Sequence, residues 1–381
     1  TSDGGPQAHT AILARGLGLP AIVAAKGVTD IADGTIVYVE SNEGIVDTEP
    51  TDADREAAIK YANRKPVADF DGQGVLADGT RVELYANVGD GKSAEKAASL
   101  KAEGVGLLRT EFGFLGHDSE PSIETQAKTY KSVFDAFPGK HIVVRTLDAG
   151  ADKPLPFLNV NPEENPALGV RGFRTDWTVP GVLTRQLEAI KAASENSDAD
   201  IWVMAPMIST TSEARNFANM LKEIGLPVHG VMVETPAAVM NAEAILGEVD
   251  FVSIGTNDLT QYTMAADRLL GDLAHLNNPW QPAVLKMIKM TVEGAQRASV
   301  TAGKKKYVSV CGEAAADPAL AVVLIGLGVD TLSMNAGAIP AVAAVLKSVT
   351  KEKAQQIAAI ALQQISSAEA KESARKALPI L

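Results

Sequence analysis

The feature that most constrains this chain is a regular alternation of short apolar runs with amphipathic runs, starting near residue 72. Leu183, Leu187 and Ile190, for example, fall on one face of a helical run over Val182–Ala193. Eight strands joined by helical crossovers over ~300 residues match a (β/α)8 barrel, with a doubly wound sheet as the competitor. The predicted strands are Val82–Asn87, Val105–Arg109, Ile142–Arg145, Ile201–Ala205, Gly230–Glu234, Phe251–Gly255, Tyr307–Cys311 and Thr331–Met334.

Polar residues of catalytic types follow five of these strands. Any one set is more often an ion pair or a helix cap than an active-site group. In a barrel, however, the carboxyl ends of all strands meet at one mouth, where barrel enzymes hold their active sites, so five sets favour the barrel. The sets are Arg109-Thr110-Glu111, Arg145-Thr146-Leu147-Asp148, Glu234-Thr235-Pro236, Gly255-Thr256-Asn257-Asp258 and Cys311-Gly312-Glu313.

The residue types at these strand ends suit a small, doubly anionic substrate and a metal ion. Arg109 and Arg145 offer planar forks for phosphate or carboxylate oxygens. Glu234 and Asp258 suit Mg²⁺, which prefers oxygen ligands and keeps substrate and water in its shell. A phosphorylated carboxylic acid fits this combination. Two further arginines in the loops after the third and sixth strands add positive charge: Arg171 and Arg268.

Cys311 is the only cysteine of the chain and has two interpretations. A lone cysteine is ordinarily a small core residue. At a barrel strand end, a thiol with a pKa of about 8.5 stays protonated near neutral pH and is a candidate proton donor.

The first twenty residues contain a second candidate. The pair Gly4-Gly5 leads to His9, and Thr10 is a plausible N-cap of a short helix that ends near Gly18 and Pro20. Free amides and the helix dipole favour an anion at such a position, so His9 is either an ordinary surface histidine or a carrier of a phosphoryl group.

The chain is expected to fold as three parts. Residues 1–48 are predicted to be part of an α/β domain, with further strands expected upstream. Residues 49–71 are predicted to contain a charged linker helix that ends near Pro66, and residues 72–381 to form the barrel. The short strands expected in the first part are Ala21–Val23, Thr35–Val39 and Gly44–Val46.

Composition excludes several classes of function. A net charge of −12 and a pI near 5.0 argue against nucleic acid as a partner. The basic run Lys304-Lys305-Lys306 is interpreted as solvated surface. A single cysteine excludes a disulfide framework and fits the reducing cytoplasm. No apolar run approaches the length of a membrane span, so no membrane insertion is expected.

Five segments together resemble the enzyme I family of the bacterial phosphoenolpyruvate-dependent sugar phosphotransferase system, lacking its N-terminal portion. The resemblance extends over essentially the full length, and the combination of motifs is highly specific. The segments are Gly104–Phe112, Asn165–Arg171, Val233–Ala238, Ser253–Tyr262 and Cys311–Glu313.

The resemblance implies a role for each candidate residue. His9 is the phosphorylated histidine, while Cys311 protonates the enolpyruvate carbon. Substrate contacts and Mg²⁺ ligation come from the remaining candidates: Arg109, Arg145, Asn257, Asp258, Arg268 and Arg171 for the substrate, and Glu234 and Asp258 for Mg²⁺. The phosphoryl group then passes to the histidine phosphocarrier protein, whose docking insertion is not found in this chain. The family is dimeric through its barrel.

Two alternatives stay open. Pyruvate phosphate dikinases and phosphoenolpyruvate synthases resemble the chain in the histidine segment and the barrel. They usually carry Ala after the histidine, where this chain has Thr10, and Thr110-Glu111-Phe112 resembles enzyme I. The other alternative is a binding and dimerisation module that holds phosphoenolpyruvate without turning it over.

Overall fold

The computed structural model describes residues 1–2, 14, 21–40, 44–62, 70–149, 155–158 and 162–380. It divides into two compact units: residues 1–69 with 264–278, and residues 70–263 with 279–381. Within the described part of the chain, no helix combines the length and apolar character needed to cross a bilayer.

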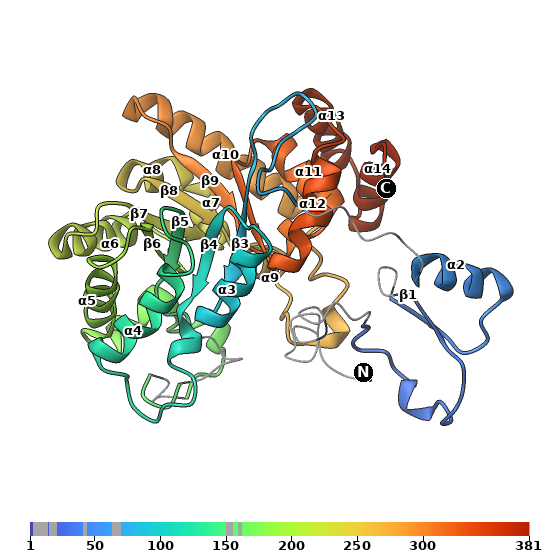
Figure 1. Cartoon of the computed structure of the whole chain (residues 1–381), viewed down its shortest axis with the longest axis horizontal. Coiled ribbons are helices and arrows are strands. Elements are labelled where there is room, and N and C mark those ends of the chain that lie inside the picture. Colours follow the sequence, from blue (N-terminus) through green and yellow to red (C-terminus); the bar gives the residue numbers. More distant parts are fainter. Residues whose placement is uncertain are drawn as a thin grey trace. The chain divides into compact units, whose positions relative to one another are not determined.

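The second unit is a closed barrel of eight parallel strands, in the order β10-β3-β4-β5-β6-β7-β8-β9 (Figure 1). Pairing of β10 with both β9 and β3 closes the sheet, so no strand edge is left open. The strands are β3 (Glu83–Val88), β4 (Gly104–Arg109), β5 (His141–Arg145), β6 (Asp200–Ala205), β7 (His229–Val233), β8 (Phe251–Ile254), β9 (Tyr307–Val310) and β10 (Thr331–Met334).

The predicted barrel is therefore confirmed, and each predicted strand lies within one residue of the observed one at both ends. The physical reason is burial on both faces. Every residue of β7 and of β8 is buried, because side chains alternate between the barrel interior and the layer beneath the helices. In the sequence, such strands appear as continuous apolar runs that are separated by residues typical of turns.

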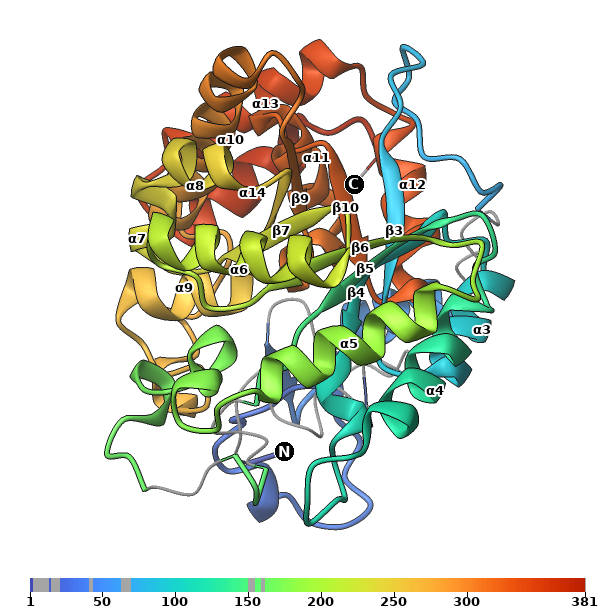
Figure 2. The same ribbon diagram turned by 90° about the vertical axis from the view of Figure 1, so that its left-hand side faces the viewer.

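Helices surround the strands on the outside (Figures 1 and 2). Local signals define them: α6 begins with a capping box of Thr210 and Glu213 and ends at Gly225 in the left-handed conformation. The helices are α3 (Gly91–Ser99), α4 (Ile123–Phe134), α5 (Val182–Ser194), α6 (Thr211–Ile224), α7 (Pro236–Met240), α8 (Ala242–Glu248), α9 (Thr256–Met264), α10 (Pro282–Ala302), α11 (Pro318–Leu327), α12 (Ile339–Leu346), α13 (Lys351–Leu362) and α14 (Ser367–Ala377).

Two apolar layers hold this unit together. The larger lies between strands and helices and includes the predicted α5 face of Leu183, Leu187 and Ile190, which is buried as expected. A smaller cluster contains one buried residue from each of five consecutive strands, together with Cys311: Leu107, Val143, Met204, Met232 and Phe251.

Aromatic and ionic pairs occupy the amino ends of the strands. Trp202 packs edge-on against the His141 ring, with ring centroids 4.2 Å apart, and also contacts Phe251. His229 Nδ1 and Lys304 Nζ both contact the Asp250 carboxylate, Lys304 at 2.7 Å. This end of the barrel is where stabilising contacts are found in barrel enzymes, opposite the catalytic mouth.

The interpretation of the lysine run as solvated surface is wrong for one of its three members. Lys304 and Lys305 are exposed and pair with Asp250 and Asp330. Lys306 is buried, and its ammonium donates to the carbonyl oxygen of Val249. Val249 is the C-cap of α8, where carbonyl groups left unpaired by the helix attract a cation.

The first unit contains two short strands and one α-helix among its described residues. Strands β1 (Tyr38–Glu40) and β2 (Ile45–Asp47) pair antiparallel, and α2 (Asp52–Ala62) lies where the linker helix was expected. The predicted strand Ala21–Val23 is wrong: these residues form no strand, and the carbonyl oxygen of Ile22 accepts a hydrogen bond of 2.8 Å from the terminal amine of Thr1. Its described residues also form the short 3-10 helices η1 (Val28–Asp30) and η5 (Gly271–Leu273).

Replacing Asp250 by Asn is expected to lower the free energy of unfolding at pH 7 by about 1 to 3 kcal/mol, since two donors lose an ionised acceptor. Burial alone raises the pKa of Asp250, but hydrogen bonds from His229 and Lys304 hold that pKa well below its ordinary value. A depressed pKa gives stability above the unfolded value of about 3.9 that is lost as the pH falls through the folded value.

Urea unfolding of both proteins between pH 7 and pH 3 measures this difference, which should shrink toward the acid end. Asp135→Asn is the control, because its pair with Lys131 is exposed and contributes little. A difference between wild type and Asp250→Asn that does not change with pH contradicts the assignment.

Candidate active site

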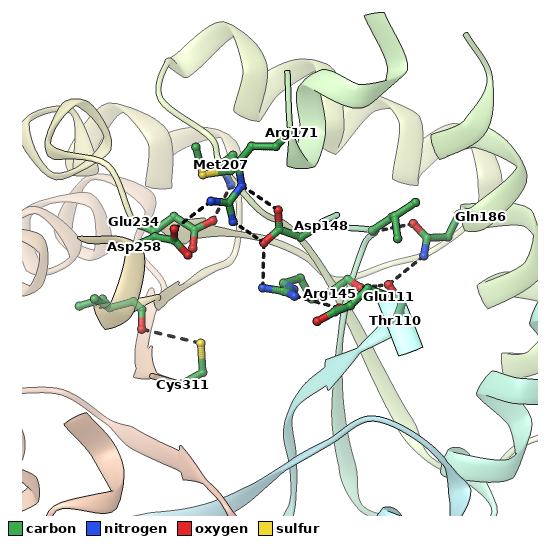
Figure 3. Close-up of polar contacts among 12 residues, drawn as sticks. Thr110, Glu111, Arg145, Asp148, Arg171, Gln186, Met207, Glu234, Asp258 and Cys311 are labelled. Carbon is green, nitrogen blue, oxygen red and sulfur yellow. Dashed lines mark hydrogen bonds and ion pairs between the residues drawn. The ribbon is translucent and has the colours of Figure 1, made fainter. Parts of the chain in front are cut away.

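The carboxyl ends of the barrel strands bring predicted side chains together at one mouth; Figure 3 shows Arg145, Arg171, Glu234, Asp258 and Cys311 there. Arg109 and Arg145 are the last residues of β4 and β5. Glu234 directly follows β7, and Cys311 directly follows β9. Asp258 lies in the first turn of α9, which begins two residues after β8 ends.

A chain of buried ion pairs connects these side chains. Arg145 Nη2 donates to Glu111 Oε2 at 2.9 Å, and its Nη1 lies 3.1 Å from Asp148 Oδ2. Arg171 donates two hydrogen bonds to the same Asp148 carboxylate, from Nε at 3.2 Å and from Nη2 at 2.9 Å. Its Nη1 donates to Asp258 Oδ1 at 2.9 Å. Asp148 thus joins both guanidinium groups.

The buried negative charge exceeds the buried positive charge here. Four carboxylates at the mouth are buried, against the two guanidinium groups of Arg145 and Arg171. Burial, followed by the neighbouring charges of Asp258 and Asp148, raises the pKa of Glu234 to about 8. An uncompensated buried carboxylate is costly, so this cluster favours a bound cation or a proton.

The backbone fixes the position of Glu234. Its Oε1 accepts a hydrogen bond of 2.7 Å from the amide of Met207, which follows β6. Met207 has a positive φ of 61°, a conformation that costs roughly 1–2 kcal/mol for a residue with a side chain. On the other side, a Cβ at position 255 would lie 2.5 Å from Glu234 Oε2, so a side chain there would displace the carboxylate from its present position.

The donor set fits a magnesium ion. No group of three or more His, Cys, Asp or Glu side chains is arranged to hold a metal in the described residues. Mg²⁺ does not need such a cage, because it binds through one or two carboxylates and takes the remaining oxygens from substrate and water. Glu234 and Asp258, buried side by side with excess negative charge, provide two carboxylates of this kind (Figure 3).

Two arginines keep donors available for an anion. Among the described residues, the Nε atoms of Arg109 and Arg145 are buried and make no hydrogen bond. The Arg109 guanidinium also lies 5.7 Å from the centre of the Phe112 ring, which orients its plane. A buried donor without a partner is unfavourable, so both groups are prepared to bind oxygen atoms of a ligand.

Cys311 joins the inner cluster to the mouth. It is buried, and its thiol contacts the carbonyl oxygen of Ile254 at 3.7 Å. Burial raises the pKa of this thiol to about 11, so it holds its proton at neutral pH. Asn257, another predicted residue, accepts a hydrogen bond of 3.3 Å from the amide of Glu313, two residues beyond Cys311.

Two predicted residues lie outside the described part of the barrel unit. His9 lies outside the described residues, so its place in the site stays a prediction. Arg268 belongs to the first compact unit, and its contact with substrate also stays a prediction.

Three residues contribute to this mouth in roles that the sequence does not reveal. Asp148 lies in a recognised strand-end set, but nothing there reveals that it joins two arginines. The backbone amide of Met207 donates to the Glu234 side chain, and the Gln186 side chain on α5 bonds to the backbone amide of Leu147 and to the Thr110 hydroxyl. Only the position of Asp148 after a barrel strand pointed to the site.

Comparison with known protein families agrees with this chemistry. Residues 67–351 match the family model described as the phosphoenolpyruvate-binding domain of PEP-utilising enzymes. Residues 1–44 match the model described as the mobile domain of the same enzymes. The barrel with its charged mouth therefore belongs to a PEP-utilising enzyme.

Similar proteins show which family of PEP-utilising enzymes this chain belongs to. The chain is 45% identical to a phosphoenolpyruvate-protein phosphotransferase of Streptomyces coelicolor, over 99% of this chain and 68% of the relative. It is 39% identical to one of Haloferax volcanii, over 98% and 67%, and 40% identical to a multiphosphoryl transfer protein of Xanthomonas campestris, over 95% and 44%. This chain belongs to the phosphoenolpyruvate-protein phosphotransferase family, as its motifs predicted, and spans about two thirds of the first two relatives.

Replacing Arg171 by Met is expected to lower the free energy of unfolding by about 3 to 5 kcal/mol, because Asp148 and Asp258 lose a buried partner. Arg185→Met is the matched control: Arg185 also grips a carboxylate with two nitrogens, that of Glu120, but is 40% exposed. Its loss should cost at most about 1 kcal/mol. Equal losses in urea unfolding would show that Arg171 does not balance the buried charge.

Proposed function

We propose that this chain transfers the phosphoryl group of phosphoenolpyruvate to His9 and releases pyruvate. One observation carries the proposal: two arginines with available donors, two buried carboxylates and a protonated thiol gather at one barrel mouth. Phosphoenolpyruvate together with Mg²⁺ matches this set. The arginines pair with anionic oxygens of the substrate, the two carboxylates would hold the metal ion, and the thiol supplies the proton that the substrate carbon accepts when the phosphate leaves.

Arg109 and Arg145 bind the phosphate in this proposal. Phosphate oxygens accept from guanidinium donors in planar, two-point contacts, and the unpaired Nε atoms supply such donors. Asn257 and Arg268 contact the substrate, as the family resemblance implies. Arg171 already uses its three nitrogens on Asp148 and Asp258, so it contributes charge to the substrate site and keeps both carboxylates in place.

In this proposal Glu234 and Asp258 would hold Mg²⁺ through their carboxylate oxygens. The ion, when bound, neutralises charge that develops on the phosphoryl oxygens. The amide of Met207 and the close approach of Gly255 orient Glu234 before the substrate arrives. Positioning of this kind lowers the barrier without reorganisation during the reaction.

His9 and Cys311 carry the two chemical steps. A neutral ring nitrogen of His9 attacks phosphorus, and the bond from phosphorus to the enol oxygen breaks, leaving the enolate of pyruvate. The Cys311 thiol gives its proton to the terminal carbon of that enolate, which forms pyruvate and a thiolate. The thiolate recovers a proton from solvent.

Labelled phosphoenolpyruvate tests the transfer itself. With Mg²⁺, the chain is expected to acquire an acid-labile phosphoryl label, and His9→Ala is expected to lose it, because no other group receives the phosphoryl. Gel electrophoresis after acid and alkaline treatment measures the label. A wild-type chain that binds phosphoenolpyruvate but gains no label would instead be the passive binding module.

Cys311→Ala is expected to bind phosphoenolpyruvate as the wild type does, yet to form pyruvate about 10² to 10⁴ times more slowly, because the enolate loses its acid. Binding calorimetry and the rate of pyruvate formation separate the two effects. Cys311→Ser is a conservative companion, since a hydroxyl of similar size is a much weaker acid. Pyruvate formation at the wild-type rate in Cys311→Ala would remove this residue as the acid.

The phosphoryl group on His9 passes next to the histidine phosphocarrier protein. The phosphotransferase itself works in the cytoplasm as a homodimer that forms through its barrel. An exposed apolar surface supports the dimer: Trp177, at the end of η4 (Gly172–Trp177), is 62% exposed. It lines a groove of about 490 Å³ among η4, α5 and α6, whose lining is mixed: Phe173, Leu183 and Met220 are the other apolar residues, and Asp176, Thr210, Ser212, Glu213 and Asn216 are polar. Apolar surface of this kind is typical of interaction sites.

A further inference from the structure

Gln186 is the buried polar side chain on the inner face of α5. It is 1% exposed and lies among Leu183, Leu187 and Ile190 on the face that packs against the barrel. A buried amide without partners costs free energy, so a glutamine at this place must have both ends of its amide paired.

Every polar atom of the Gln186 amide is paired. Its Oε1 accepts a hydrogen bond of 2.8 Å from the amide of Leu147, and its Nε2 donates to Thr110 Oγ1 at 3.0 Å (Figure 3). The same Nε2 donates to the Tyr130 hydroxyl of α4 at 3.1 Å. Thr110 Oγ1 in turn donates to the carbonyl oxygen of Arg145 at 2.9 Å.

These partners lie between the charged residues of the mouth. Thr110 stands between Arg109 and Glu111, at the end of β4. Leu147 stands next to Asp148 and two residues after Arg145, at the end of β5. β4 and β5 already pair directly, with Arg109 opposite Arg145. Gln186 adds a side-chain bridge just beyond that pair, through a hydroxyl after one strand and a backbone amide after the other.

We propose that Gln186 is a positioning residue for phosphate binding, which sets the spacing between the ends of β4 and β5 and so between the guanidinium groups of Arg109 and Arg145. The inference rests on the proposed function, in which these two arginines bind the phosphate. Gln186 touches neither arginine side chain through its amide and acts only through Thr110 and Leu147. A misplacement of about 1 Å at a reacting group can reduce a rate by about 100-fold, so the spacing matters.

The competing explanation is that Gln186 merely fastens α5 to the barrel. The contact of Gln186 with Tyr130 makes it possible to distinguish this structural role from the positioning role. Tyr130 is buried on α4, and its hydroxyl also donates to Gln126 Oε1 at 3.2 Å, on the side of the network that leads to Pro121. Tyr130→Phe therefore damages the same buried network and leaves the contacts of Gln186 to both strand ends in place.

The test measures pyruvate formation from phosphoenolpyruvate and Mg²⁺ in single turnovers of the full chain. Gln186→Met keeps the length of the side chain and removes its hydrogen bonds. We expect the limiting rate divided by the half-saturating substrate concentration to fall by about 10- to 100-fold. Tyr130→Phe is expected to stay within about twofold of wild type, although both variants lose stability in urea unfolding.

Equal turnover in Gln186→Met and Tyr130→Phe, at similar losses of stability, overturns the positioning role. If Gln186→Met does not fold, Thr110→Val and Thr110→Ser decide the matter. Loss of turnover in Thr110→Val that Thr110→Ser restores supports the relay through the hydroxyl, and equal turnover in the two overturns it. A wild-type chain that does not bind phosphoenolpyruvate overturns the proposed function together with this inference. Wild-type turnover matched by Gln186→Met overturns the positioning role alone.

Discussion

Closure of the parallel sheet is the constraint on which the rest of the barrel unit depends. With β10 paired to β3, all eight strands run in one direction and their carboxyl ends meet around one mouth. Side chains that follow the strands are thereby forced together, whatever their charges. The ion pairs of Asp148 with Arg145 and Arg171 reduce the cost of this crowding, because the two guanidinium groups offset half of the charge of the four buried carboxylates.

The charges at the mouth do not cancel, and the unbalanced groups lie in different places. Arg145 and Arg171 are held by carboxylates on several sides, whereas Glu234 shares its surroundings with Asp258 and Asp148 and carries the raised pKa. The remaining donors, on Arg109 and Arg145, point to the need for an anion, while the remaining carboxylate points to the need for a cation. A substrate anion with a metal cation satisfies both needs at once, which neither ligand does alone.

The sequence predicted the barrel well because parallel strands buried on both faces appear as apolar runs, and strand-end chemistry could be located from them. It failed where a residue's environment depends on distant chain. Ala21–Val23 has the composition of a strand but no ladder partner among the described residues. Lys306 is buried because the carbonyl of Val249 faces it from another element. Gln186 looks like any polar residue of an amphipathic helix, since its partners lie 76 and 39 residues away along the chain.

The burial of Cys311 gives this protein a built-in reporter. It is the only cysteine of the chain, it is 3% exposed, and its thiol resists ionisation. Alkylating reagents attack the thiolate. The folded barrel therefore protects this sulfur in two ways: burial keeps the reagent away, and the thiol stays protonated. The rate at which such a reagent modifies the chain therefore measures how often the top of the barrel opens, without any label introduced by mutation.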